Sequence, residues 1–300
     1  MIRPCPVCGA SGAGQRVHSE AKIDPSRVSE FTYASRKNPE FMHHRLVLCG
    51  VCDLLYADPA PDPDSTRRAY EAAAYDSSEE AHCAARTYAE TLDGFLSRLP
   101  AREGALDVGT GDGAFLEELL ARGFTRVAGI EPSEAPARAA RADVRPLIRK
   151  RLDAESLDGE SLALVTCFQT MEHLHEPAAL CRVAYRLLKP GGALFLVCHD
   201  RRSAVNRLLG KKSPIFDIEH LQLFSPRSAA ALMTRSGFPN ATIRPIRNRY
   251  PLRYWIRLLP LGLQIKNALL ALAEKLKWAG RPVALNVGNM AVIGFKGAAA

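Results

Sequence analysis

A glycine-rich loop between a predicted strand and a predicted helix constrains the fold of this chain more than any other feature. Residues 105–108 form a short apolar strand that contains Asp107, and a helix begins at Ala114 after the loop. Glycine lets the backbone turn sharply and approach a ligand closely, because it has no Cβ and adopts positive φ readily. The helix that follows directs its free N–H groups toward the same place. The pattern therefore predicts a ligand site around three residues, Gly109, Gly111 and Gly113.

The charges around the loop indicate which class of cofactor it suits. The glycine spacing also fits a dinucleotide fingerprint, but a pyrophosphate would lie close to the carboxylates of Asp107 and Asp112, which is unfavourable. S-adenosylmethionine (SAM) instead carries an ammonium and a sulfonium group, which a carboxylate at a strand end attracts. Glu131 ends the next predicted strand about 20 residues after the loop, where an acid suits the ribose hydroxyls of SAM or of NAD. The charges therefore favour SAM over a dinucleotide.

Three further motifs follow the loop. They are Asp-Ala-Glu at 153–155, FQTMEHL at 168–174 and LLKPGG at 187–192. Their order is that of the class I SAM-dependent methyltransferases, and the chain resembles that family over residues 101–200.

The resemblance implies roles for residues outside the loop. It places Phe168 in the cofactor site and implies that Asp153 accepts a hydrogen bond from the adenine amino group, with a solvated loop acid as the alternative. It also implies that a helical stretch covers the cofactor. In that stretch Tyr70 or Tyr75 would hydrogen-bond the methionine carboxylate, unless either tyrosine is an ordinary packing residue. Tyr75 is the one we include among the cofactor-binding candidates.

The alternation of strands and helices after Gly104 predicts an α/β fold, a doubly wound, seven-stranded Rossmann-like methyltransferase sheet preceded by a zinc-binding module. The domain organisation we expect is a zinc-binding module at 1–60, a helical cap over the cofactor at 61–100, and a methyltransferase domain at 101–300. Helical sequence is expected from about 65 to 99. Within the third domain we expect strands at 105–108, 127–130, 162–168 and 193–199, a short strand within 143–152, an antiparallel edge pair at 241–246 and 290–295, a substrate insertion near 200–225 and a helical lid near 252–280.

Two matched cysteine pairs lie near the N-terminus. Cys5 and Cys8 form one CxxC turn, and Cys49 and Cys52 form the other. Four thiolates presented by two turns are the tetrahedral ligand set that Zn²⁺ prefers. Because such a site has no open coordination position, we expect the zinc to be structural.

Composition limits the other function classes. The formal charge is +8, but Arg and Lys are spread over most of the chain without a long basic run, so we favour a solvated surface over a nucleic-acid surface. No apolar run approaches the length of a membrane span. The first residues lack the apolar core of a signal peptide, so we expect a cytoplasmic protein whose eight cysteines do not form disulfides.

A basic amphipathic helix is predicted from Leu263 to about Trp278. A lid over an apolar substrate, or the surface of a homodimer, is the interpretation we favour. Attachment to a membrane surface is a further alternative.

Methyl transfer to a hydroxyl or carbon acid needs a base as well as correct positioning, and histidine is the usual base near neutral pH. His173 follows the fourth predicted strand and His220 lies in the insertion, so these two are the catalytic candidates. His173 could instead only shape the pocket. His175 and His199 are weaker candidates.

The function we expect is methylation of a small-molecule acceptor, most simply on oxygen in a biosynthetic pathway. The segment EHLQLFS at 219–225 resembles that of quinone-type O-methyltransferases. One alternative is C-methylation of a nucleotide-linked sugar, because enzymes of that class carry an N-terminal zinc-binding segment. Another is RNA methylation with the zinc module as the RNA-binding part, although aromatic–basic clusters for base stacking are few. A non-enzymatic zinc scaffold is the weakest alternative, because the cofactor loop is intact.

Overall fold

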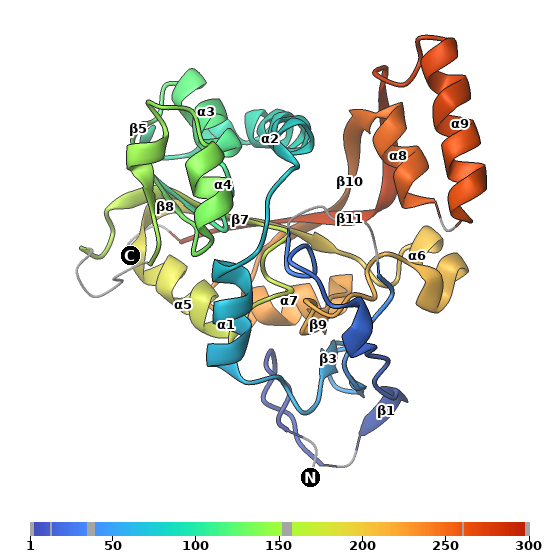
Figure 1. Cartoon of the computed structure of the whole chain (residues 1–300). Helices are drawn as coiled ribbons and strands as arrows, with labels where there is room; N and C mark the ends of the chain where they lie inside the picture. Colours follow the sequence, from blue (N-terminus) through green and yellow to red (C-terminus); the bar gives the residue numbers. More distant parts are fainter. Residues whose placement is uncertain (1–2, 13, 35–39, 152–157, 260, 298–300) are drawn as a thin grey trace.

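A seven-stranded mixed sheet forms the centre of the computed structural model (Figure 1). Five adjacent strands pair in parallel, while β11 runs antiparallel to both of its neighbours, β8 and β10. The strands, in spatial order, are β10 (Thr242–Pro251), β11 (Pro282–Phe295), β8 (Leu188–His199), β7 (Leu162–Phe168), β4 (Glu103–Val108), β5 (Thr125–Ile130) and β6 (Ile148–Arg149). The structure describes residues 3–12, 14–34, 40–151, 158–259 and 261–297.

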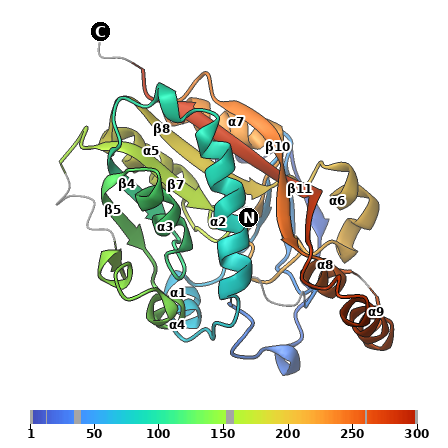
Figure 2. The same cartoon turned by 90° about the horizontal axis from the view of Figure 1, so that it is seen from above.

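Helices cover both faces of this sheet. Successive residues of the central strands point to opposite faces: Leu106 and Val165 pack in one hydrophobic cluster, Ala105 and Leu164 in the other. Strand β7 is buried at every position, as expected for a parallel strand with helices on both sides. The prediction of a doubly wound sheet with an antiparallel edge is confirmed. The helices on one face are α2 (Ser78–Asp93), α3 (Ala114–Ala121) and α4 (Glu134–Ala139), and those on the other are α5 (Pro177–Leu187) and α7 (Pro226–Arg235) (Figures 1 and 2).

The helical stretch expected from about 65 to 99 is interrupted. It forms α1 (Pro63–Glu71), the longer α2 and a short 3₁₀ turn. In the break, the backbone N–H of Ala74 donates to the carbonyl of Glu30 instead of to a helical partner. A hydrogen bond to a distant segment thus replaces the helical one. The 3₁₀ turns of the chain are η1 (Pro25–Arg27), η2 (Leu96–Arg98), η3 (Arg145–Leu147) and η4 (Gly210–Lys212).

The N-terminal segment builds a second, four-stranded sheet, and its last strand comes from the insertion after β8. The order is β1 (Gln15–Ser19), β2 (Leu46–Cys49), β3 (Leu55–Ala57) and β9 (Gln222–Leu223). Side chains of this segment, including Val7 and Tyr56, belong to the same hydrophobic cluster as Leu187 of α5 and Met233 of α7. The N-terminal segment and the large sheet therefore share a core.

The two edge strands extend well beyond the residues expected for them. β11 pairs with β8 from Asn289 onward, whereas its first residues pair only with the end of β10. This two-stranded extension carries α8 (Leu252–Leu258) and α9 (Leu263–Lys275), which project from the rest of the molecule (Figure 1). The insertion after β8 contributes α6 (Ala204–Leu209). Among the described helices, none is long and apolar enough to cross a bilayer.

Candidate functional site

A cavity of about 880 Å³ opens at the carboxyl ends of the central strands, where an open α/β sheet usually binds its ligand. Gly109 and Gly111 of the loop after β4 line it, as do Glu131 after β5 and Phe168 at the end of β7. Tyr75 lines it from the break between α1 and α2, and α8 contributes Trp255. The structure therefore brings these sequence-predicted cofactor residues to one cavity. The third predicted glycine, Gly113, does not line the cavity, and a Cβ there would lie 2.6 Å from the side chain of Val144.

The loop needs glycine for two different reasons. Gly109 has a φ of 77°, and a Cβ there would lie 2.1 Å from Oγ1 of Thr170, so a larger residue would collide with its neighbour. Gly111 has a φ of 60°, and a Cβ there would meet no heavy atom within 4 Å. A backbone in the left-handed region beside open cavity space is the geometry that lets a ligand approach closely.

Two acids lie beside the loop. Thr166 donates a 2.6 Å hydrogen bond from its hydroxyl to Asp107, and burial raises the pKa of this carboxyl to about 6. Glu131 accepts hydrogen bonds from the backbone N–H groups of Gly111 and Ser133, both at 2.9 Å, while burial raises its pKa. Both carboxyls carry a desolvation cost, which a cationic or hydroxyl-bearing ligand would offset.

Three histidines, His173, His199 and His220, line the cavity and lie beside one another. The ring centroids of His173 and His220 are 5.0 Å apart, and those of His220 and His199 are 5.2 Å apart. The backbone explains why two distant segments converge: the carbonyl of Glu172 accepts from the N–H groups of Leu221 and Gln222. The hydrogen bonds beside each histidine thus hold the end of β7 against the insertion.

Hydrogen bonds fix the orientation of these rings. Nδ1 of His220 donates to the carbonyl of Ile215 at 2.7 Å, so in the neutral ring Nε2 is the basic nitrogen. Nδ1 of His173 lies 2.5 Å from the hydroxyl of Tyr70 and 3.5 Å from the carboxylate of Glu219. Burial lowers the pKa of His199 to about 3, so that this ring is neutral.

The similarity to known proteins decides the family. A family model described as a methyltransferase domain matches residues 67–243. The chain belongs to this methyltransferase family. The prediction of a SAM-dependent methyltransferase is therefore confirmed at the level of the family.

The relatives of this methyltransferase cover only part of it. The ubiquinone biosynthesis O-methyltransferase of Pseudomonas paraeruginosa is 37% identical over 111 residues, which is 34% of this chain and 44% of that protein. The protein of the same name from Pseudomonas aeruginosa is 36% identical over 111 residues, with the same coverage. This methyltransferase thus spans less than half the length of these curated relatives. A solved SAM-dependent methyltransferase from Archaeoglobus fulgidus is 17% identical, with a TM-score of 0.49, and the alignment covers 71% of this chain and 94% of that one.

Some site residues of the methyltransferase differ from the expectation or were missed. Asp153 lies outside the described residues. Tyr70, expected either to bind the methionine carboxylate or to be an ordinary packing residue, has its hydroxyl 2.5 Å from Nδ1 of His173. Gln169 has a φ of 52° and lines the cavity, and no partner is found within the described chain for either polar atom of its buried amide. An unsatisfied buried amide fits a site whose ligand supplies the missing partner. Gln169 belongs to the FQTMEHL motif at 168–174, but the motif assigned it no role, because its backbone conformation is set by the tertiary fold.

The four predicted zinc ligands of the methyltransferase come together. Their sulfurs all lie within 4.8 Å of one another, with Cys5 Sγ 3.5 Å from Cys52 Sγ and Cys8 Sγ 3.6 Å from Cys49 Sγ. Zn–S bonds of about 2.3 Å in a tetrahedron place sulfurs about 3.8 Å apart. The observed spacing therefore fits zinc, and three of the four cysteines are buried.

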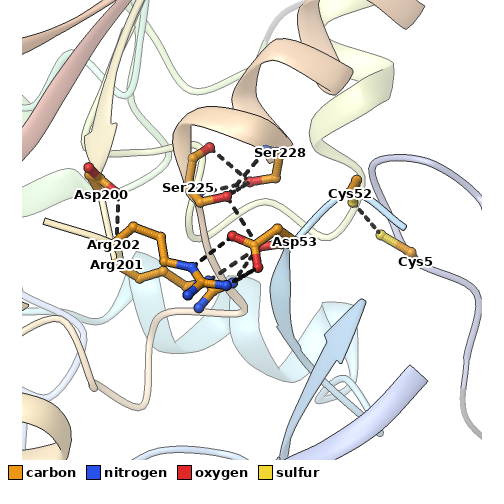
Figure 3. Close-up of polar contacts among 8 residues, drawn as sticks. All are labelled: Cys5, Cys52, Asp53, Asp200, Arg201, Arg202, Ser225 and Ser228. Atoms are coloured by element: carbon orange, nitrogen blue, oxygen red, sulfur yellow. Dashed lines mark hydrogen bonds and ion pairs between the residues drawn. The ribbon is translucent and has the colours of Figure 1, made fainter. Parts of the chain in front are cut away.

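The residue after the last cysteine connects this cluster to the end of β8 (Figure 3). Both carboxylate oxygens of Asp53 accept from Arg202, at 2.6 and 3.0 Å, and Arg201 forms a second ion pair with the same carboxylate. Ser225, the N-cap of α7, donates its hydroxyl to the carbonyl of Asp53. Although burial raises it, these hydrogen bonds and the two arginine charges lower the pKa of Asp53 to about 2. The cysteine cluster is thus linked to both ends of the insertion that carries His220.

Proposed function

We propose that this methyltransferase transfers the methyl group of SAM to a hydroxyl of a small-molecule acceptor, with His220 as the base. The observation that carries the proposal is the hydrogen bond from Nδ1 of His220 to Ile215, which leaves Nε2 as the basic nitrogen of a buried ring that lines the cavity. A base fixed in this way removes the acceptor proton as the methyl arrives.

The residues around the glycine loop hold the cofactor in this proposal. When bound, SAM supplies an electrophilic methyl group on a sulfonium. Asp107 attracts the cationic end of the cofactor and Glu131 accepts from its ribose, while Gly111 permits close approach. Tyr75, Phe168 and Asp153 remain proposed contacts.

His173 positions the acceptor rather than removing its proton. Its Nδ1 is engaged by Tyr70 and lies 3.5 Å from Glu219, so the ring is oriented by two partners. A ring oriented in this way suits a hydrogen-bonding contact with an acceptor oxygen. The two histidines thus have different roles in the same step.

An oxygen acceptor is supported by the names of the curated relatives, which are O-methyltransferases of ubiquinone biosynthesis. C-methylation of a nucleotide-linked sugar is a second candidate, favoured by the four-cysteine cluster in the N-terminal segment. Both reactions need a base, so the histidine geometry serves either one. The identity of the product separates them.

We also propose that Cys5, Cys8, Cys49 and Cys52 hold one structural zinc. Thiolate ligands require reduced cysteines, which supports a cytoplasmic location. The zinc stabilises the N-terminal segment, and takes no part in the chemistry because four protein ligands close its coordination sphere.

The test uses purified protein, methyl-labelled SAM and a panel of catechols, phenols and keto-sugars, with the product identified by mass spectrometry. His220→Gln is expected to lower turnover by about 10²–10⁴-fold and to leave SAM affinity unchanged. His173→Gln is expected to raise KM for the acceptor more than it lowers kcat. His82→Gln on the outer part of α2 is the control and keeps full activity. Full turnover by the His220 variant with a hydroxyl acceptor would refute the assignment of the base.

A further inference from the structure

The projecting arm, residues 247–288, has a more positive charge than the rest of the chain. It holds eight of the 40 arginines and lysines but only one of the 32 acidic residues, Glu274. Outside the arm the chain has 32 basic and 31 acidic residues, so the arm carries +7 of the net charge of +8. Although Arg and Lys are spread along the sequence, nearly all of the excess positive charge lies in this one element.

Part of this charge holds the arm in place. Arg249 pairs with Glu90, Arg253 with Glu79 and Arg257 with Glu80, and all three acids belong to α2. The arm is therefore fixed to the helix that covers the sheet.

Three of the five remaining cations of the arm lie near the end of α9. Lys275, Lys277 and Arg281 are exposed, and no ion pair is found for them among the residues that the structure describes. Exposed Trp278 lies between them in sequence, with Arg281 5.7 Å from the centre of its ring.

An apolar stripe lies along the outside of α9. Ile265, Leu272 and Leu276 are spaced so that they share one side of the helix, and they are 54%, 52% and 43% exposed. Leu269 and Ala273 lie on the neighbouring side and pack against α8. The helix thus has a wider apolar surface than α8 covers.

We propose that the stripe and the adjacent cations of the arm form a docking surface for an anionic lipid bilayer. Leucine, isoleucine and tryptophan beside lysine and arginine are the composition of helices that lie in the membrane interface, with the apolar side chains inserted and the cations at the headgroups. Each cation near an anionic surface adds to the attraction. The proposal goes beyond the proposed function and does not depend on which acceptor is methylated.

Charge favours a lipid surface over a second copy of this chain. A symmetric dimer through the stripe would bring Lys275, Lys277 and Arg281 of two arms together, and like charges across an interface are unfavourable. Lysine is also depleted at protein interfaces, and two of these three cations are lysines. The arm also borders the cavity, because Trp255 and Leu258 of α8 are among the residues that line the cavity.

The experiment measures binding of the full chain to vesicles by flotation and by fluorescence. Vesicles of phosphatidylcholine with phosphatidylglycerol are compared with vesicles of phosphatidylcholine alone. We expect binding to the anionic vesicles and weaker binding at high salt. The fluorescence emission of the exposed Trp278 should shift to the blue on binding, and the Trp278→Phe variant should lack this shift. Trp255 is the other of the two tryptophans and is already buried.

Two variants separate charge from insertion. The triple variant Lys275→Glu, Lys277→Glu, Arg281→Glu is expected to lower the partition coefficient by at least about 100-fold. The triple variant Ile265→Ser, Leu272→Ser, Leu276→Ser is expected to lose the fluorescence shift. Leu208→Ser is the matched control, since Leu208 is 87% exposed but lies on α6 outside the arm. None of these residues lines the cavity, so SAM binding and melting temperature monitor folding.

Three outcomes would overturn the proposal. They are absence of binding to anionic vesicles, equal binding to neutral vesicles, and unchanged binding by both triple variants. A dimer in light scattering that the serine variant dissociates, without lipid binding, would instead assign the stripe to a second copy of the chain.

Discussion

The hydroxyl of Tyr70 and Nδ1 of His173 are 2.5 Å apart although the two residues are separated by more than a third of the chain. Glu219 lies 3.4 Å from the same hydroxyl, so one phenol connects α1, the end of β7 and the insertion. The ring orientation of His173 therefore depends on three separate segments.

Tyr70→Phe removes this connection while keeping the ring. We expect a loss of about tenfold in kcat/KM, carried mostly by KM of the acceptor, because one neutral hydrogen bond is removed. SAM affinity, measured by calorimetry, should stay within twofold. Tyr185→Phe on α5 is the control. A large loss of SAM affinity in the Tyr70 variant would show that this residue contacts the cofactor instead.

Asp107→Asn is expected to weaken SAM binding and to stabilise the ligand-free protein. The folded-state pKa of Asp107, about 6, lies above that of an unfolded aspartate, so this group makes the fold less stable as the pH rises toward 6. Asparagine keeps the acceptor for Thr166 but removes the buried charge. The melting temperature should therefore rise, and rise more at pH 8 than at pH 5.

The loss of SAM affinity in the Asp107 variant should be about 10–100-fold, as for a charge-assisted contact of about 1.5–3 kcal/mol. Asp143→Asn, at an exposed position, is expected to change neither the SAM affinity nor the melting temperature. Unchanged SAM affinity in the Asp107 variant, measured by titration calorimetry, would contradict the role proposed for this carboxylate.

Zinc analysis by mass spectrometry should give one ion per chain. Cys8→Ser is expected to release it and to lower the melting temperature, because the cysteine cluster shares a hydrophobic core with α5 and α7. Cys83→Ser on α2 should keep both zinc and stability. Metal-free wild-type protein after expression with ample zinc would exclude the site.

Asp53→Asn tests the link between the cysteine cluster and the insertion. Because the folded-state pKa of Asp53, about 2, is below the unfolded value, its contribution to stability is present above pH 4 and is lost as the pH falls toward 2. Asparagine tolerates the φ of 67° at this position, so the variant removes charge without straining the backbone. We expect a loss of about 1.5–3 kcal/mol in denaturant unfolding at neutral pH. Most of that difference should disappear in acid.

The matched control for this variant is Asp64→Asn, whose carboxylate pairs with Arg67 on the exposed surface of α1. Exposed pairs contribute little, so its stability should be close to that of the wild type. Equal stability of the Asp53 variant and this control would mean that the cluster and the insertion are not coupled.

The sequence by itself determined the parts of this protein that depend on local pattern. The strand at 162–168 was predicted with its observed bounds, because a continuous apolar run is typical of a parallel strand covered on both faces. Glycines at alternate positions predicted the loop, since positive φ is a local requirement. The two CxxC turns likewise identified four cysteines that the structure brings together.

Only the tertiary structure decided which distant segments meet. Helical propensity from 65 to 99 gave no sign of the break, because the hydrogen bond from Ala74 to Glu30 joins segments that are remote in sequence. The contact of Tyr70 with His173 was likewise not predictable, because it requires α1, the end of β7 and the insertion to lie together. The net charge was visible in the sequence, but the sequence did not show which cations form ion pairs and which stay exposed. Ion pairs to α2 use three arginines of the arm, and the fold leaves Lys275, Lys277 and Arg281 beside an uncovered apolar stripe. Which side chains are exposed and which charges form ion pairs depends on the packing of distant segments, so only the folded chain defines them.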